Sequence, residues 1–172
     1  FNDFFIRRFK STARTFTNRK EEMPAFAEGR YLGYLSISEK QTCPVKGIHL
    51  SPAAILGDVL RAKPFQEGPC LIARLCPTDY HRFHYPDDGT TRDTYRISGR
   101  LHSVNPIALQ AKPDIFLKNE RQVSILETKN FGLLAIVEIG ALCVGKIVQT
   151  HPRDESFTRG AEKGYFLFGG ST

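Results

Sequence analysis

Two histidines stand three residues apart in residues 79–86, Asp-Tyr-His-Arg-Phe-His-Tyr-Pro, which follow an apolar stretch typical of a strand. An imidazole changes its charge near neutral pH, so His81 or His84 could act as a general base or a general acid. The two could instead bind zinc with Cys76 as a third ligand, although this spacing is a weak signal. Two surface histidines without a chemical role are the third interpretation.

Residues 167–172, Leu-Phe-Gly-Gly-Ser-Thr, place Ser171 directly after two glycines. Glycine adopts backbone geometries that other residues resist, and a serine hydroxyl can attack a neighbouring carbonyl once a base removes its proton. Ser171 could therefore react with the carbonyl of Gly170. Taken alone, the same letters also describe a plain flexible tail, so this segment must be interpreted together with the rest of the chain.

The elements that must position these groups are mostly strands. The chain has 172 residues, of which 41% are hydrophobic, so it can bury a core, and this composition excludes a disordered chain. Ser51-Pro52 begins a helix whose apolar stripe ends near Lys63. Apolar runs separated by turn signals predict strands over residues 31–38, 70–76, 94–101, 123–128, 133–139, 142–150 and 165–168.

This pattern favours a mainly β fold of the α+β class. We expect a compact antiparallel β sandwich or barrel-like core with a few short helices and an amphipathic N-terminal arm. Residues 1–22 should form the arm and its linker, and residues 23–172 should form the core. No stretch reaches the roughly 18 consecutive apolar residues that a membrane-spanning helix needs.

The arm holds most of the positive charge. Residues 1–20 contain six lysines and arginines against one aspartate, whereas the formal net charge of the whole chain is +6. Phe1, Phe4, Phe5 and Phe9 fall near one face of a short helix and the basic residues largely on the other, which is typical of an interfacial helix. We therefore expect the arm to face an anionic membrane rather than nucleic acid. Packing of its phenylalanines on the core is the alternative.

Taken together and in order, these motifs resemble those of the phosphatidylserine decarboxylase family. The two-histidine segment and the Gly-Ser-Thr segment are the most specific, and the matching segments span nearly the whole chain. They are residues 1–7 (Phe-Asn-Asp-Phe-Phe-Ile-Arg), 79–86, 119–121 (Asn-Glu-Arg), 137–141 (Val-Glu-Ile-Gly-Ala) with 144–145 (Val-Gly), 164–166 (Gly-Tyr-Phe) and 169–172 (Gly-Gly-Ser-Thr).

The resemblance implies a precursor that cuts its own chain between Gly170 and Ser171. Ser171 Oγ attacks the Gly170 carbonyl, and elimination and hydrolysis then leave a covalent pyruvoyl group in place of the serine. This group is the implied cofactor, an electron sink for the loss of carbon dioxide. The large subunit would end at Gly170, and the partner would be the protein's own small subunit, which begins at Ser171. The 172 residues would then be the large subunit and the first residues of the small one.

The resemblance also assigns roles to individual residues in the cutting step. His84, the second histidine of the motif, is the base that activates Ser171. Glu28, in Ala27-Glu28-Gly29, stands where the family has an aspartate that orients this histidine. Glutamate keeps the charge but is one methylene longer, which puts the rate of maturation in question.

The decarboxylation step is assigned to the other histidine. By resemblance, His81 assists it as an acid or as a substrate contact. Loss of a carboxylate is favoured where water is excluded, so apolar side chains should line the site. The candidates are Tyr80, Phe83 and Phe168.

The implied substrate is phosphatidylserine in an anionic membrane, and the implied products are phosphatidylethanolamine and carbon dioxide. The protein would be a peripheral membrane protein, at a bacterial cytoplasmic membrane or an organelle membrane, with no resident metal; a homodimer is left open. One alternative is a soluble relative that decarboxylates a free amino acid such as tryptophan. Another is a non-catalytic membrane-binding module, which the glutamate at position 28 favours.

The remaining polar motifs have two interpretations. Asn119-Glu120-Arg121 and Glu138 are expected to brace the core through a buried Glu–Arg arrangement. Contact between Arg121 and a lipid head group is the alternative.

Overall fold

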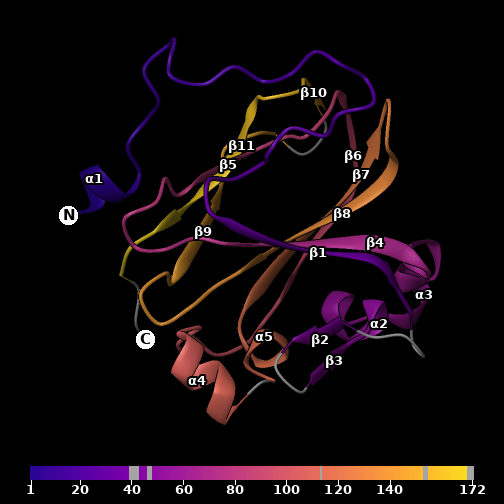
Figure 1. Cartoon of the computed structure of the whole chain (residues 1–172), viewed down its shortest axis with the longest axis vertical. Coiled ribbons are helices and arrows are strands. Elements are labelled where there is room, and N and C mark those ends of the chain that lie inside the picture. Colours follow the sequence, from indigo (N-terminus) through magenta and orange to yellow (C-terminus); the bar gives the residue numbers. More distant parts are fainter. Residues whose placement is uncertain (39–42, 46–47, 113, 153–154, 170–172) are drawn as a thin grey trace.

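A computed structural model describes residues 1–38, 43–45, 48–112, 114–152 and 155–169, with the backbone alone for residues 43–45 and 48–50. Within these residues, antiparallel strands dominate and the helices are short, which confirms the expected β-rich fold of the α+β class. Figure 1 shows a curled sheet with the helices of residues 52–118 gathered at one end of the molecule and the N-terminal helix apart from them.

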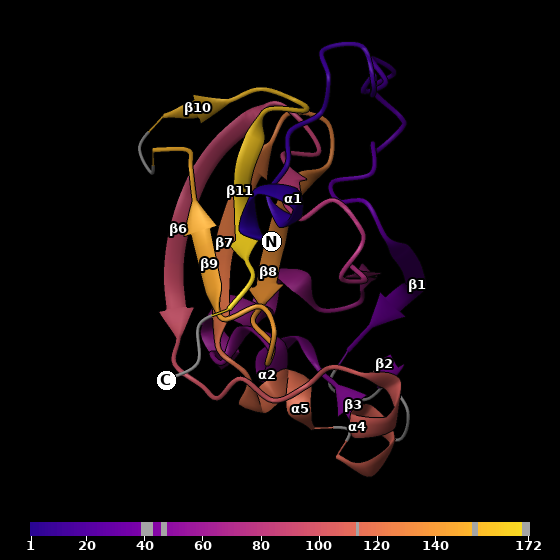
Figure 2. The same cartoon turned by 90° about the vertical axis from the view of Figure 1, so that its left-hand side faces the viewer.

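The principal sheet has the strand order β10–β6–β7–β8 and curls like half a barrel (Figure 2). Val123 and Leu126 lie on opposite faces of β7, and both are fully buried. Leu56 from the helices packs on Val123, and Phe157 packs on Leu126, so core side chains cover both faces of this strand. The strands are β6 (Gly89–Ile97), β7 (Arg121–Thr128), β8 (Gly132–Ile139) and β10 (Ser156–Phe157).

A second sheet carries the histidine motif and has the order β5–β11–β9, formed by β5 (Arg82–His84), β11 (Glu162–Leu167) and β9 (Lys146–Gln149). In its register, His84 lies opposite Glu162 and Phe83 lies opposite Gly164. A Cβ at Gly164 would be 2.2 Å from the Val148 carbonyl oxygen and 2.8 Å from the Phe83 ring. The missing side chain therefore lets β5 and β9 approach β11 closely.

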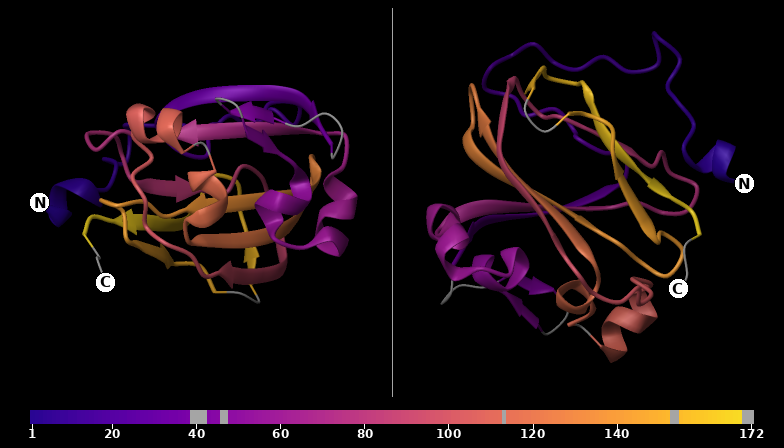
Figure 3. Two further views of the ribbon diagram at one scale, coloured as in Figure 1. Left: turned by 90° about the horizontal axis from the view of Figure 1, so that it is seen from below. Right: turned by 180° about the vertical axis from the view of Figure 1, so that it is seen from behind.

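The remaining elements lie at the opposite end from the β6–β10 contact, beside a two-stranded sheet of β1 (Arg30–Ile37) and β4 (Gly68–Arg74) (Figure 3). Of these elements, the helices contribute Leu56 and Ala62 to the core around Val123. These elements are the pair β2 (Cys43–Val45) and β3 (Ile48–Leu50), the helices α2 (Pro52–Leu56), α3 (Val59–Ala62), α4 (Pro106–Ala111) and α5 (Ile115–Lys118), and the 3₁₀ helix η1 (Lys63–Phe65).

The helix predicted from Ser51 is interrupted, and in this respect the prediction was wrong. Ser51 caps α2 as expected, because its Oγ accepts a hydrogen bond from the Ala54 N–H at 3.2 Å. Gly57 then takes a left-handed conformation with φ of 67°, which ends α2. Asp58 begins a new helix by accepting the Leu60 N–H at 2.7 Å, so two short helices replace one.

Two predicted strands have different limits in the structure. The strand expected over residues 94–101 begins earlier and ends earlier, as β6. The strand expected over residues 142–150 is reduced to β9, because Val144 N–H donates to the Ala141 carbonyl at 2.8 Å and closes a tight turn there. The short strands β2, β3, β5 and β10 and the helices α4 and α5 had no prediction.

The arm begins with the single helical turn α1 (Asn2–Phe5), and then crosses the molecule as extended chain to β1 (Figure 1). Phe5 is 1% exposed, whereas Phe1 is 69% and Phe4 is 48% exposed. The helical turn therefore packs one phenylalanine on the core and leaves two largely exposed. No helix in the described ranges is long and apolar enough to span a bilayer.

Candidate active site

The loop before β5 and β5 itself hold both histidines beside β11. Asp79 closes the loop: its Oδ2 accepts the Cys76 N–H at 2.6 Å, and its own N–H donates to the Cys76 carbonyl at 2.8 Å. The His81 carbonyl accepts the Phe166 N–H at 2.9 Å. These backbone contacts fix the histidine segment to the strand that leads towards Gly169.

The His84 ring is held at both nitrogens. Nδ1 lies 2.9 Å from the Gly160 carbonyl oxygen, and Nε2 lies 3.0 Å from the Tyr80 hydroxyl. Burial lowers the pKa of His84, so its ring is neutral near pH 7. Because a carbonyl can only accept, the single proton is on Nδ1 and the hydroxyl donates to the lone pair of Nε2. His84 is therefore an uncharged base whose Nε2 is the basic atom.

His81 has a similar environment. It is 2% exposed, and its ring stacks on Phe5 with 3.6 Å between ring centroids. Its Nδ1 donates to the Asp79 carbonyl at 2.9 Å, so the lone pair of the neutral ring is on Nε2. Burial also lowers the pKa of His81. Both histidines thus have the protonation state that a general base needs near neutral pH.

Phenylalanines of the arm cover this histidine pair. The Phe9 ring stacks on Tyr80 with 3.8 Å between centroids, and the Phe16 ring lies 5.3 Å from the His84 ring. With Phe5 on His81, three arm side chains contact the motif. Packing of arm phenylalanines on the core, one of the two interpretations of the sequence, therefore occurs in the structure.

A buried arginine fastens the arm to β5. Arg82 is 5% exposed, and its Nε donates to the Ile6 carbonyl at 2.8 Å. Its Nη1 also forms an ion pair with Glu162 at 2.7 Å. The arm and β11 are thus joined through one guanidinium group that lies between the two histidines in sequence.

Glu28 lies near His84 but pairs with another residue. The backbone N–H of His84 donates to the Phe26 carbonyl at 2.8 Å, so the chain two residues before Glu28 touches the histidine strand. The Glu28 carboxylate forms an ion pair with Arg14 of the arm. Gly160, not Glu28, accepts the Nδ1 proton of His84 in this structure. The orienting role of Glu28 stays a prediction.

The three expected apolar wall residues have different surroundings. Tyr80 contacts His84 directly. The Phe168 ring packs on Phe1 at 4.4 Å and on Phe5 at 5.5 Å between centroids, and so joins the aromatic group around His81. Phe83 faces the other side of β5 and packs on Phe166 at 5.1 Å. Two of the three therefore belong to the histidine side of the sheet.

Gly170 and Ser171, the predicted cutting site, lie outside the described residues. Gly169 has φ of 83°, and its N–H donates to the Cys143 carbonyl at 3.1 Å. His84 lies opposite Glu162, and the five steps from there to Leu167 make about 16 Å of extended strand. The His81 carbonyl instead bonds to Phe166. His81 therefore lies nearer than His84 to Gly169.

The zinc interpretation of the motif would have to use the Nε2 atoms of the two histidines, and that of His84 is bonded to the Tyr80 hydroxyl. Both Nδ1 atoms, of His81 and of His84, bond to backbone carbonyls. In the part of the chain that the structure describes, no group of three or more histidine, cysteine, aspartate or glutamate side chains is placed to hold a metal ion.

The Asn-Glu-Arg motif braces the core, but not through the expected Glu–Arg arrangement. Asn119 is fully buried, and its side-chain amide donates to the Gly140 carbonyl at 2.7 Å. Arg121 donates to the Phe116 carbonyl at 3.0 Å, whereas Glu120 pairs with Arg96 at the surface. The Glu–Arg expectation was therefore wrong about the partners, and burial of Arg121 disfavours the alternative of a lipid contact.

Glu138 has a partner that the sequence interpretation missed. Lys163 of β11 is 2% exposed, and its Nζ lies 2.7 Å from Glu138 Oε1 and 2.6 Å from Gln149 Oε1. A lysine next to Gly-Tyr-Phe in an apolar strand was the available signal, since a buried ammonium needs a partner.

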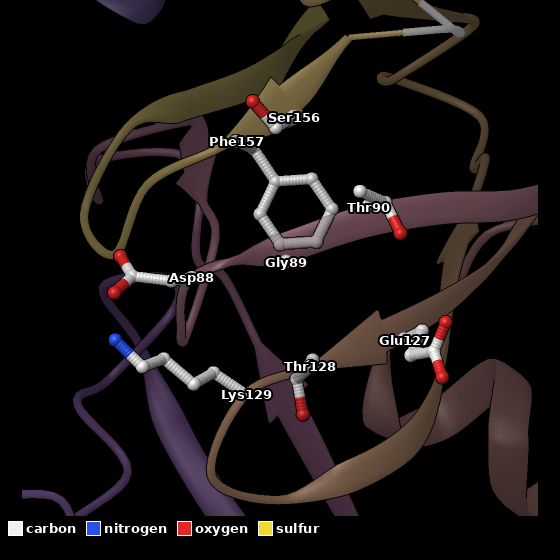
Figure 4. A pocket seen from close by; sticks show the side chains of 8 residues that line it. All are labelled: Asp88, Gly89, Thr90, Glu127, Thr128, Lys129, Ser156 and Phe157. Carbon is white, nitrogen blue, oxygen red and sulfur yellow. The ribbon is translucent and has the colours of Figure 1, made fainter.

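A hollow elsewhere on the surface contains none of the candidate residues. It lies where β10 meets β6 and β7, and mixed polar side chains line it (Figure 4). Another open hollow does touch the candidate site, because Glu28, Cys76 and Asp79 all line it. The second hollow therefore gives Glu28 and the loop before His81 a common surface.

Comparison with known proteins identifies the family of this β-rich domain and its histidine pair. The sequence model of the family described as "Phosphatidylserine decarboxylase" matches residues 1–172. This chain belongs to the phosphatidylserine decarboxylase family, which confirms the resemblance seen in the motifs.

The curated relatives have the same family name. The chain is 44% identical over 172 residues to a phosphatidylserine decarboxylase proenzyme of Clostridium botulinum and 45% identical to one of Clostridium tetani. A third, from Ruminiclostridium cellulolyticum, is 42% identical. Each match covers 100% of this chain but only 57 to 58% of the relative, so the chain spans little more than half the length of these proteins.

Proposed function

We propose that the whole protein is a phosphatidylserine decarboxylase that matures by cutting its chain between Gly170 and Ser171. One observation carries this proposal: two neutral histidines, His81 buried and His84 half-buried, lie beside the strand that leads to Gly169. Family membership along the entire chain and the proenzyme names of the relatives support it.

The maturation chemistry needs a nucleophile and a base. The Ser171 hydroxyl gives its proton to a histidine Nε2, and Oγ attacks the Gly170 carbonyl carbon. The peptide C–N bond breaks as the ester C–O bond forms. Loss of the Ser171 Cα proton then expels Gly170 as a carboxylate, and water replaces the nitrogen of the dehydroalanine, which leaves as ammonia. The resemblance assigns the base to His84, and the neutral ring supports that role.

The pyruvoyl group formed from Ser171 supplies an electron sink when carbon dioxide leaves. The residues present fit such a group, because Phe168, next to Gly169, belongs to an aromatic cluster with Phe5 and His81. Phe5 and Phe168 exclude water there. His81 Nε2, with its lone pair, can accept and return a proton.

The lipid substrate agrees with the outward face of the arm. Phe1 and Phe4 are exposed, and the Arg7 guanidinium lies over the Phe4 ring, 4.5 Å from its centroid. Basic residues near an anionic bilayer contribute about 1 kcal/mol each. A peripheral position at an anionic membrane follows, with phosphatidylserine as the lipid.

The arm's role is tested with phosphatidylserine vesicles. Because Phe5 is buried and Phe1 packs on Phe168, the informative variant is Phe4→Ser, which leaves these contacts intact. We expect weaker binding at moderate salt than for the unchanged protein. Equal binding would exclude the exposed arm face as the lipid contact.

Intact mass tests the maturation step. The whole protein should give two fragments, the smaller one blocked at its amino end, whereas Ser171→Ala and His84→Ala should remain uncut. His81→Ala is the matched comparison, because His81 lies nearer to Gly169 in this structure. If His84→Ala cuts normally and His81→Ala does not, the base assignment moves to His81. A single uncut chain in the unchanged protein contradicts the proposal.

Release of carbon dioxide then tests the substrate. The matured protein should act on phosphatidylserine in mixed micelles and leave free serine and free tryptophan unchanged. Preference for a free amino acid would favour the alternative of a soluble amino-acid decarboxylase.

A further inference from the structure

Three aromatic rings form a stack over the base assigned to the cutting step. Tyr80 lies between Phe9 and His84, at 3.8 Å and 5.7 Å between ring centroids, with interplanar angles of 12° and 13°. The Phe9 and His84 planes differ by 14°. Tyr80 is 3% exposed, so its hydroxyl has few directions in which to find a partner. That partner is His84 Nε2, the basic nitrogen of the ring.

The hydroxyl stays protonated at any pH at which the protein functions. Burial raises the pKa of Tyr80 to about 12. The Gly160 carbonyl holds the proton of the neutral His84 ring on Nδ1, so the protonated phenol can only donate to the free lone pair of Nε2. The Tyr80 contact therefore stabilises the neutral ring in the tautomer that the Gly160 carbonyl selects.

The clamp on Tyr80 comes from a distant part of the chain. Phe9 belongs to the arm, and the arm is fastened close by, where Arg82 Nε donates to the Ile6 carbonyl at 2.8 Å. The neighbouring Arg8 pairs with Glu162 at 3.2 Å. These two contacts fix the arm on either side of Arg7, and so hold the neighbouring Phe9 ring against Tyr80.

We propose that Tyr80 and Phe9 are positioning residues for His84: the Tyr80 hydroxyl holds the basic Nε2 by a hydrogen bond that stabilises the neutral ring, and Phe9 keeps the Tyr80 ring in place. The inference rests on the proposed function, in which His84 is the base. It makes the arm a structural part of the histidine site as well as a surface for lipid.

The charged groups that face His84 are few. Glu162 from β11 favours the charged ring and Arg82 from β5 disfavours it, while burial opposes charge from all sides. Removing the Tyr80 hydroxyl leaves these groups unchanged. A change in His84 can then be assigned to the lost hydrogen bond, because that bond stabilises only the neutral ring.

The test is nuclear magnetic resonance of the whole protein with labelled histidine, in which ¹⁵N shifts report the tautomer and a pH titration reports the pKa. In the unchanged protein, His84 should have its proton on Nδ1. Tyr80→Phe keeps the ring stack and removes only the hydroxyl. It should leave the proton of the neutral ring on Nδ1, where the Gly160 carbonyl holds it, and raise the proton affinity of His84 about three- to tenfold, the size of one hydrogen bond. An unchanged titration would overturn the proposal.

Matched variants separate this effect from general loosening. Tyr95→Phe removes another tyrosine hydroxyl, one that donates to the Leu56 carbonyl at 2.8 Å, and should leave His84 unaffected. Phe9→Ala should raise the proton affinity of His84, as Tyr80→Phe does. Phe9→Tyr keeps an aromatic ring against Tyr80 and should leave the proton affinity of His84 as in the unchanged protein. Phe4→Ala removes an exposed arm ring and should have no effect. An equal response to Phe4→Ala and Phe9→Ala would overturn the role of Phe9.

The titration reads His84 directly, so it does not depend on whether the chain cuts itself. If the proton affinity of His84 depends on Tyr80 but the unchanged protein stays uncut, the proposed function fails and the positioning inference stands. If the protein cuts itself and the proton affinity of His84 does not respond to Tyr80→Phe, the positioning inference alone fails.

Discussion

The histidine site and the Glu138–Lys163 pair meet at strand β11, yet they satisfy buried polar groups in opposite ways. His81 and His84 are neutral, and they bond to backbone carbonyls and one hydroxyl under a cover of aromatic rings. Glu138 and Lys163 form a charged pair, with Gln149 as a third member. Burial raises the pKa of Glu138, and the Lys163 ammonium beside it opposes the rise.

The difference separates a group that exchanges protons from one that holds strands together. A neutral imidazole in a desolvated site has a lone pair available for chemistry. A buried ion pair instead links two strands, and removing one member leaves an uncompensated charge. The pair joins β8 to β11, and the histidines lie on β5, the next strand, and in the loop before it. The ion pair thus fixes the strand next to the histidines, whose rings can gain and lose protons.

The largest expected effect comes from breaking the ion pair. Glu138→Ala should lower the free energy of unfolding by about 3–5 kcal/mol, because the Lys163 ammonium stays buried without a counter-ion. Urea unfolding measures this loss. The double variant with Met at both positions should recover much of it. A double variant as unstable as the single one would mean that packing, rather than charge, sets the cost.

Removal of the aromatic cover over His81 should be next in size. Phe5→Ala empties a fully buried position and should cost about 3 kcal/mol in the free energy of unfolding. The control is Phe4→Ala in the same helical turn, which is half exposed and should change stability by less than about 0.5 kcal/mol. Equal losses of stability in the two variants would contradict the assignment of Phe5 to the packed face of the arm and Phe4 to its exposed face.

A pH dependence should follow from the two histidines. Their folded pKa values lie below the ordinary value of 6.5, so below that pH the unfolded chain binds protons that the folded chain does not. Stability should therefore be full above pH 6.5 and fall as the pH drops towards the folded pKa values. Urea midpoints measured across this window check the slope. Replacing both histidines by glutamine should flatten it.

The smallest effect on stability should come from Arg14→Gln. Arg14 and Glu28 form a solvent-exposed pair, and such pairs contribute little to folding. The change frees the Glu28 carboxylate, which would let it orient His84 as the family resemblance implies. Self-cutting of the whole protein, followed by intact mass, should speed up. An unchanged or slower rate would count against any role of Glu28 at His84.

Much of the fold follows from short-range patterns. Strands β1, β4, β7 and β8 lie within two residues of their predicted limits, because apolar runs bounded by Gly and Asn carry a strong local signal. The broken helix at Gly57 and the short β5 were missed, since each depends on a local cap or on one partner strand. A strand of three residues, such as Arg82–His84, is too short to show the alternation of apolar and polar side chains that reveals a strand in a sequence.

The sequence by itself determined the family, the β-rich class and the chemistry-bearing residues, because motif order and residue type are properties of the chain. Only the tertiary structure decided which groups touch. Phe9 and Tyr80 are far apart in the sequence, yet they stack, and Tyr80 in turn bonds His84. Lys163 meets Glu138 across strands in the same way. Protonation states follow from burial and such contacts, and these exist only once distant strands have come together.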